Sequence, residues 1–128
     1  NMILFGTKLY SSDNTDIRKV RCIKILGNSK KKVATLGDII RISVYKRKYK
    51  KEIIKKKIYF NLIINLKYKY RRANGSFLKF DRNRSLNLSE QLKFLGTRVY
   101  GPICKEIRNS KQKKLQYKKI ISYSNVTL

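Results

Sequence analysis

The stretch that decides the fold is IYFNLIINLKYKYRRANGSFLKF, residues 58–80. Its first part, residues 58–66, is a nearly continuous apolar run of strand length, which is typical of a β-strand buried in a core. The Asn74-Gly75 dipeptide in its second part is the strongest short-range hairpin signal in the chain. This turn joins the basic segment 67–72 to residues 76–80. The stretch therefore predicts a buried strand followed by a β-hairpin.

Further short strands are predicted on both sides of this stretch. They share branched apolar residues, period-two alternation or a closing turn, and they cover residues 7–12, 20–26 and 40–45 and the pair Leu86 and Leu88. Short strands at this spacing favour a small barrel or sandwich.

The pattern changes after Pro102, where we expect helices. Ile103, Glu106 and Ile107 recur at helical spacing, and proline is favoured at the first position of a helix. A second helix is predicted over residues 111–122, where apolar side chains lie near one face.

Nothing in the composition divides the chain, because it contains one Pro and no repeat or Ser-rich linker. The hydrophobic content of 41% is enough for one small core. We therefore expect a single domain over residues 1–128, with a β-barrel in residues 1–101 and short helices in residues 102–128.

The charge of the chain is strongly one-sided. Lys and Arg number 33, Asp and Glu number 7, and the net charge is +26. A compact domain with this excess repels itself, so we expect a polyanionic partner, either nucleic acid or an anionic membrane surface. The absence of His excludes a histidine base, a Ser-His-Asp triad and a His-ligated zinc. We expect no cofactor and no metal, and we expect Cys22 and Cys104 to be small buried side chains.

A membrane partner is the less favoured alternative. Residues 58–66 are the longest nearly apolar stretch and are far shorter than the roughly 20 residues that span a bilayer. Residues 46–57 lack the apolar face of a membrane-inserting helix. The chain opens without a basic-then-apolar leader, so we expect no secretory segment.

Three basic clusters support an RNA partner. They are the run Lys30, Lys31 and Lys32, residues 46–57 with Tyr45 and Tyr49 interleaved, and residues 67–72. A cation beside an aromatic ring suits RNA, because the cation meets phosphate and the ring stacks on a splayed base. The alternative is a solvated charged face enlarged by A/T-rich codon usage, since Lys, Ile, Asn, Tyr and Phe make up about half of the chain. All three clusters together, at +26, favour the RNA interpretation.

A metal-dependent nuclease is another alternative. It would need two or more carboxylates that converge on Mg²⁺, and the carboxylates are Asp13, Asp16, Asp38, Glu52, Asp81, Glu90 and Glu106. Asp38 and Asp81 lie beside predicted strand ends, and Asp13 precedes an Asn, positions that are typical of turns. We therefore predict no catalytic residue.

Several motifs in a fixed order resemble one family. They are DN at residues 13–14, VRCIKILG at 20–27, LGDII at 36–40, RRANGSFLKFDRN at 71–83, GTRVYGP at 96–102, EIR at 106–108 and KIIS at 119–122. Together they resemble the universal large-subunit ribosomal protein fourteen family, in its bacterial and organellar form. The resemblance runs from Met2 to Leu128.

This resemblance implies a mainly β fold, a small five-stranded β-barrel with a short helical C-terminal part. It implies a structural constituent of the large ribosomal subunit that binds large-subunit rRNA and touches a neighbouring large-subunit ribosomal protein. It also implies a bridge to small-subunit rRNA and a docking surface for a ribosome-silencing factor that includes Thr97, Arg98 and Lys119. It implies no catalytic activity and no small-molecule substrate.

We expect the RNA-facing side chains to be basic residues of the clusters and motifs, namely Lys30, Lys31, Lys32, Arg71, Arg72, Lys79, Arg82, Arg98 and Arg108. The A/T-rich composition indicates an organellar gene, so we expect the mitochondrial ribosome in the matrix, with the plastid as the alternative. The alternative function is a free-standing barrel that binds single-stranded RNA.

Overall fold

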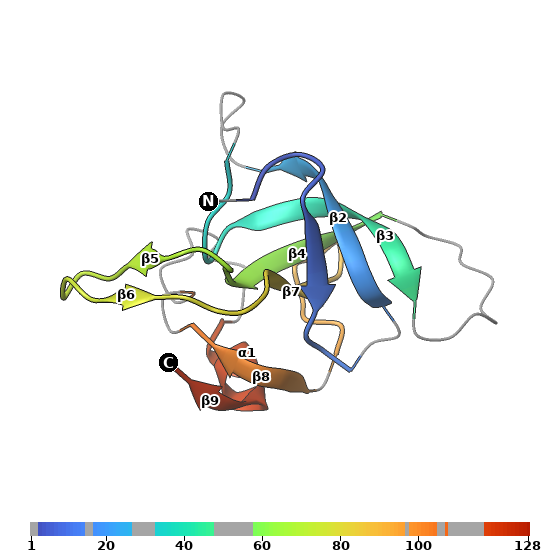
Figure 1. Cartoon of the computed structure of the whole chain (residues 1–128). Helices are drawn as coiled ribbons and strands as arrows, with labels where there is room; N and C mark the ends of the chain where they lie inside the picture. The colour runs from blue at the N-terminus through green and yellow to red at the C-terminus, as the bar shows by residue number, and fades with distance from the viewer. Residues whose placement is uncertain are drawn as a thin grey trace.

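The computed structural model describes residues 3–14, 17–26, 33–47, 58–96, 98–104, 107 and 117–128 (Figure 1). The strands are β1 (Lys8–Ser11), β2 (Ile17–Ile25), β3 (Ile39–Arg47), β4 (Ile58–Asn65), β5 (Tyr70–Arg71), β6 (Phe77–Leu78), β7 (Arg84–Leu88), β8 (Val99–Ile103) and β9 (Ser124–Thr127). The helix α1 covers Tyr117–Tyr123. No helix in these ranges is both long and apolar enough to cross a membrane.

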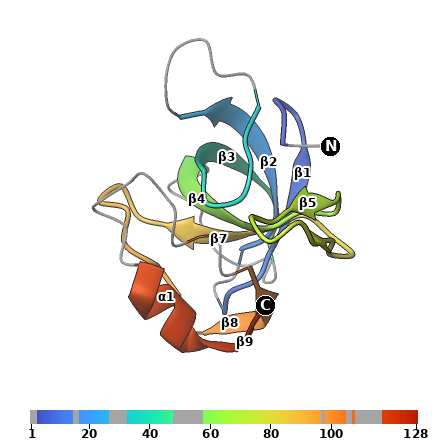
Figure 2. The ribbon, with the colours of Figure 1, turned by 90° about the vertical axis from the view of Figure 1, so that its left-hand side faces the viewer.

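Five strands close into a barrel in the order β1-β2-β3-β4-β7 (Figure 2). Neighbouring strands run antiparallel except β1 and β7, which pair in parallel through Tyr10 and Arg84 and so close the barrel. Closure leaves no open sheet edge in the barrel. The mainly β fold and the five-stranded barrel are thereby confirmed.

The apolar run of β4 is nearly continuous because both faces of this strand are buried, and its polar residues Asn61 and Asn65 are buried as well. Ile63 packs in a cluster with Val20 and Ile42 of the barrel strands. Leu62 and Ile64 belong to a second cluster, shared with β7, β8 and α1. A strand that packs on both faces needs apolar residues at successive positions rather than alternating ones.

The second cluster covers the barrel with the C-terminal elements. Its members from outside the barrel include Val99, Ile103, Ile107 and Ile120, all of them buried. In Figure 2, α1, β8 and β9 lie together on the side of the barrel next to β7. The C-terminal part therefore shares a core with the barrel.

The expectation of a helix beginning at Pro102 is wrong. Pro102 lies inside β8, which pairs in parallel with β9 through Val99–Ser124 and Ile103–Thr127. The ladder is irregular between Val99 and Pro102, and β8 belongs to a two-stranded sheet, a setting that tolerates proline because one side of the strand needs no ladder bond.

The second expected helix is present in part. Residues 117–122 of the expected segment lie in α1, and residues 111–116 lie outside the described residues. Sequence analysis did not predict β9, whose partner strand lies about twenty residues earlier in the chain.

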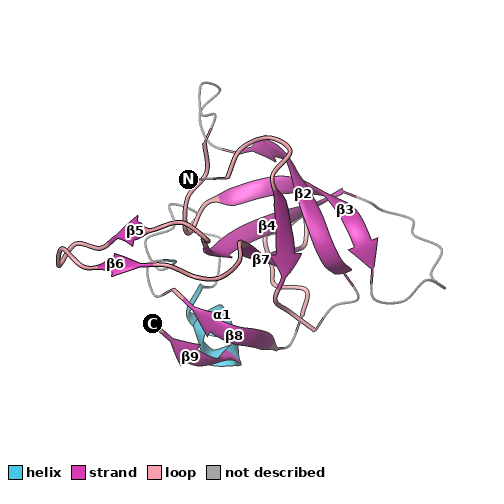
Figure 3. Ribbon diagram, viewed as in Figure 1, coloured by secondary structure: helices cyan, strands magenta, loops and turns pink. Residues whose placement is uncertain are grey.

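The predicted hairpin is formed by β5 and β6 and projects from the barrel (Figures 1 and 3). The amide of Gly75 donates to the oxygen of Arg72 at 3.0 Å, and the amide of Arg72 donates to the oxygen of Ser76 at 2.9 Å. Gly75 has φ +86°, a conformation that glycine adopts at little cost. We call residues 67–80 the arm.

Candidate nucleic-acid interface

The outer face of the arm is cationic around one aromatic ring. Arg71 and Phe77 are directly paired across β5 and β6, so their side chains share a face. Lys69 lies two positions before Arg71, and Lys79 lies two positions after Phe77, so both side chains fall on the same face. All four side chains are exposed, and residues 67–80 include no Asp or Glu. This face therefore offers positive charge without an acidic neighbour on the arm.

The inner face of the arm turns toward the body of the protein. Phe80 is buried and belongs to the barrel cluster, and Leu78 packs against that cluster. The guanidinium of Arg72 donates to the main-chain oxygen of Leu128 and lies 3.9 Å from the sulfur of Cys104. Arg72, which we expected to face RNA, therefore ties the arm to the C-terminal strand region.

A second cationic group lies at the base of the arm. Arg82 Cζ lies 4.5 Å and Lys19 Nζ 5.1 Å from the centre of the Tyr10 ring. Both are cation–π distances, and Arg82 is exposed. Sequence analysis named Arg82 as RNA-facing but missed Lys19, which lies just before the predicted strand of residues 20–26.

Arg98 lies beside the first loop of the barrel. Its amide donates to Oδ1 of Asn14 at 3.3 Å, and the amide of Tyr100 donates to the oxygen of Ser12. A Cβ on Gly96 would meet Asn14 Oδ1 at 2.6 Å. The absence of a side chain at this glycine thus allows the segment before β8 to approach that loop, with Arg98 exposed.

Lys119 lies near the same segment. It is exposed on α1 and lines a hollow of about 140 Å³ together with Phe94, Gly96 and Tyr123. The rings of Phe94 and Tyr123 are 5.9 Å apart between centroids. The structure therefore brings the predicted partner residue Lys119 close to the chain segment that leads to Arg98.

Other predicted residues lie outside the described residues. These are Lys30, Lys31, Lys32, Thr97 and Arg108, together with residues 48–57 of the middle basic cluster.

Three described carboxylates have structural partners. Asp13 is buried and accepts bonds from the amide of Asn87 at 3.0 Å and from its Nδ2 at 2.9 Å. Asp38 accepts a bond from the amide of Thr35 at 2.8 Å. Asp81 pairs with Arg84 at 3.1 Å. In the part of the chain that the structure describes, no three His, Cys, Asp or Glu side chains gather as a metal site would require.

Both cysteines are buried, as expected. Burial raises the pKa of the Cys22 thiol, and a hydrogen bond with the backbone of Lys24 opposes this shift. A buried thiol with a raised pKa is a poor nucleophile.

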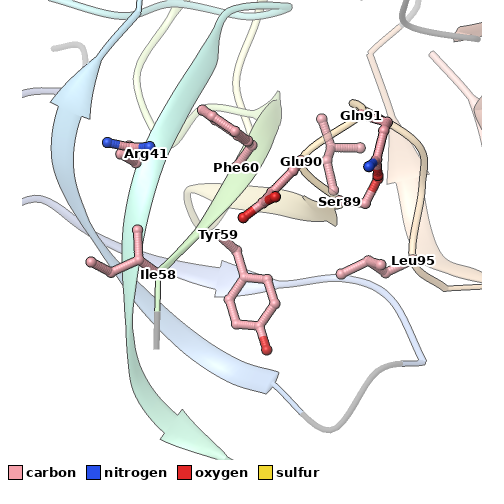
Figure 4. Close-up of a pocket in the computed structure, with 9 residues that line it drawn as sticks. Arg41, Ile58, Tyr59, Phe60, Ser89, Glu90, Gln91 and Leu95 are labelled. Atoms are coloured by element: carbon pink, nitrogen blue, oxygen red, sulfur yellow. The ribbon is translucent and has the colours of Figure 1, made fainter. Parts of the chain in front are cut away.

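A larger hollow of about 450 Å³ is lined by β3, β4 and the loop after β7 (Figure 4). Its wall combines the exposed apolar residues Ile58 and Leu95 with Arg41 and Glu90. Arg41 Cζ lies 5.4 Å from the centre of the Phe60 ring. This mixture of apolar groups and opposite charges differs from the cationic outer face of the arm.

Comparison with known families settles the classification. The family model described as Ribosomal protein L14p/L23e matches residues 2–128. The chain belongs to this ribosomal protein family. It is therefore a structural protein of the large ribosomal subunit and not an enzyme. The match spans the barrel, the arm and the C-terminal elements, and it agrees with the family indicated by the ordered motifs.

Proposed function

We propose that this chain is an rRNA-binding constituent of the large subunit of an organellar ribosome. The observation that carries rRNA binding is the outer face of the arm, where Lys69, Arg71 and Lys79 are exposed without an acidic residue in residues 67–80. The net charge of +26 supports the same partner, because packed rRNA supplies the negative charge that offsets the repulsion of a compact cationic domain.

In this proposal the barrel is a rigid spacer and the basic side chains neutralise phosphates. The RNA-facing set includes Arg71, Lys79, Arg82 and Arg98, which are exposed. Lys30, Lys31, Lys32 and Arg108 complete the set. Arg72 contributes indirectly, because its guanidinium holds the arm to the main chain at Leu128.

We assign the surface of Thr97, Arg98 and Lys119 to the docking of a ribosome-silencing factor. A bridge to small-subunit rRNA is a further contact outside the large subunit. The exposure of Arg98 and Lys119, and the hollow that Lys119 shares with Gly96, support a continuous surface at this place. A neighbouring ribosomal protein of the large subunit is a further partner.

The mitochondrial ribosome is the proposed location, with the plastid ribosome as the alternative. The supporting observation is compositional, because residues with A/T-rich codons make up about half of the chain.

Sedimentation of organellar lysates tests the proposal. Mitochondrial and plastid lysates are run through gradients, and each fraction is probed for this chain before and after a high-salt wash. We expect salt-resistant comigration with the mitochondrial large subunit. Comigration in the plastid lysate alone would move the location to the plastid. Sedimentation at the top of the gradient, or loss with salt, would overturn the ribosomal role in favour of a free-standing RNA-binding barrel.

A further inference from the structure

Phe77 is a large apolar residue of the arm that is 61% exposed. Water contact with this much apolar surface is unfavourable, whereas the apolar residue at the next position, Leu78, packs against the barrel. The ring therefore lies on the face of the hairpin that turns away from the core.

The surroundings of the ring are cationic. Lys69 Nζ lies over the ring at 5.9 Å from its centroid, and Arg71 is its direct partner across the two strands. Because 61% of Phe77 is exposed with the Lys69 ammonium beside the ring, much of the ring surface is accessible to a flat group. The site thus combines an aromatic platform with two cations beside it.

We propose that Phe77 stacks on an unpaired nucleobase of RNA while Lys69 and Arg71 meet the phosphates beside that base. This inference rests on the proposed rRNA-binding function and specifies the form of RNA that the arm takes. Every base has a π-face, so such a platform tolerates any sequence.

The chemistry favours a single-stranded or bulged segment over a duplex. In a duplex the bases are stacked on each other, and an A-form helix offers proteins mainly phosphates and 2′-hydroxyls. Those groups need the cations alone and leave the phenyl ring exposed. A protein surface is also a poor match, because lysines are depleted at the centres of protein interfaces.

The chain contains no Trp, which allows a direct optical test on the full-length protein. Phe77→Trp places a single indole on the arm, and Tyr100→Trp places one at another exposed aromatic position, 55% exposed in β8. The probes are a mixed-sequence single-stranded RNA oligonucleotide and the corresponding blunt duplex. We expect single-stranded RNA to quench the indole at position 77 strongly, the duplex to quench it weakly, and neither RNA to quench the indole at position 100 to the same extent.

Binding measurements with the same probes give the energetic test. Phe77→Ala should weaken binding of single-stranded RNA about tenfold, in line with the loss of one stacked base. Phe77→Trp should retain the affinity, and Tyr100→Ala should leave it unchanged. Affinity for the duplex should be the same for all four proteins. Thermal melts of each variant check that the barrel stays folded.

The outcomes distinguish failure of the stacking inference from failure of the proposed rRNA-binding function. Unchanged affinity of Phe77→Ala, an unquenched indole at position 77, or an equal loss for single-stranded RNA and duplex would overturn the stacking role. If Arg71→Glu still weakens binding in that case, rRNA binding through the arm stands. Failure of the wild-type chain to bind either RNA would overturn both.

Discussion

Arg71 and Arg72 are adjacent in the chain but lie on opposite faces of the arm. Arg71 is exposed and paired with Phe77, whereas Arg72 is half-buried and donates to the main-chain oxygen of Leu128. Successive side chains of a strand point to opposite faces, so one arginine is available to a partner and the other holds the fold. Mutation of each arginine should therefore affect a different property, RNA binding for Arg71 and stability for Arg72.

Arg72→Gln should lower the free energy of unfolding by about 1 kcal/mol, because the half-buried Arg72 loses the charged group that donates to the main-chain oxygen of Leu128. Its effect on the salt dependence of RNA binding should be small. The matched variant Arg71→Gln should reverse this pattern. Its stability should change little, and the slope of log RNA affinity against log salt concentration should become smaller in magnitude by about one. Denaturant melts and RNA titrations at several salt concentrations measure both. Equal effects of the two variants would contradict the assignment of faces.

Asp13 is a buried carboxylate that accepts two hydrogen bonds from the buried Asn87. Asp13→Ala should cost roughly 3 kcal/mol of unfolding free energy, because the amide and the Nδ2 of Asn87 lose a buried acceptor. The control is Asp81→Ala, since Asp81 is 70% exposed and pairs with Arg84. This control should change stability by about 0.5 kcal/mol or less. Comparable losses in urea melts would show that burial of Asp13 does not set its importance.

At the scale of elements, the arm depends on its turn. Gly75 has φ +86°, and a Cβ there would meet nothing within 4 Å, so the cost of a side chain is backbone strain alone. Gly75→Ala should destabilise the hairpin by about 1 kcal/mol. Amide exchange should accelerate in residues 71–78 and stay unchanged in the barrel strands.

Gly6 provides a matched control for the turn. It has the same φ of +86° and the same open space, but it lies before β1. Gly6→Ala should leave exchange in the arm unchanged. Slower exchange in the arm of Gly75→Ala, or equal acceleration there by both variants, would show that the turn at Gly75 does not control the arm.

At the scale of the whole molecule, charge repulsion opposes the compact state. The chain carries +26, and the Debye length falls from about 30 Å at 0.01 M salt to about 3 Å at 1 M. The melting temperature of the RNA-free protein should therefore rise by several degrees between these salt concentrations. Circular dichroism melts measure this shift. A midpoint independent of salt would mean that the charges do not repel each other across the fold.

Much of the fold and part of the site followed from the sequence. The strands, the Asn74-Gly75 turn and the basic character of the arm are local or periodic features, readable from neighbouring residues. Arg71 and Lys79, which we predicted to face RNA, are exposed, but the sequence could not distinguish Arg72 from Arg71. Lys19 was missed, because its contact with Tyr10 comes from pairing between β1 and β2.

The sequence by itself determined the charge, the strand segments and, through its ordered motifs, the family. Only the tertiary structure decided the conformation around Pro102 and the two faces of β4. Ile103 and Ile107 have a spacing that fits a helix. In the structure Ile103 lies in β8 instead, and both residues are buried in one cluster with residues of β4 and β7. The partner of β8 is β9, which begins about twenty residues after β8 ends. Local sequence patterns reflect the preferences of neighbouring residues. The strand around Pro102 and the burial of both faces of β4 depend instead on packing against segments that are distant in the chain.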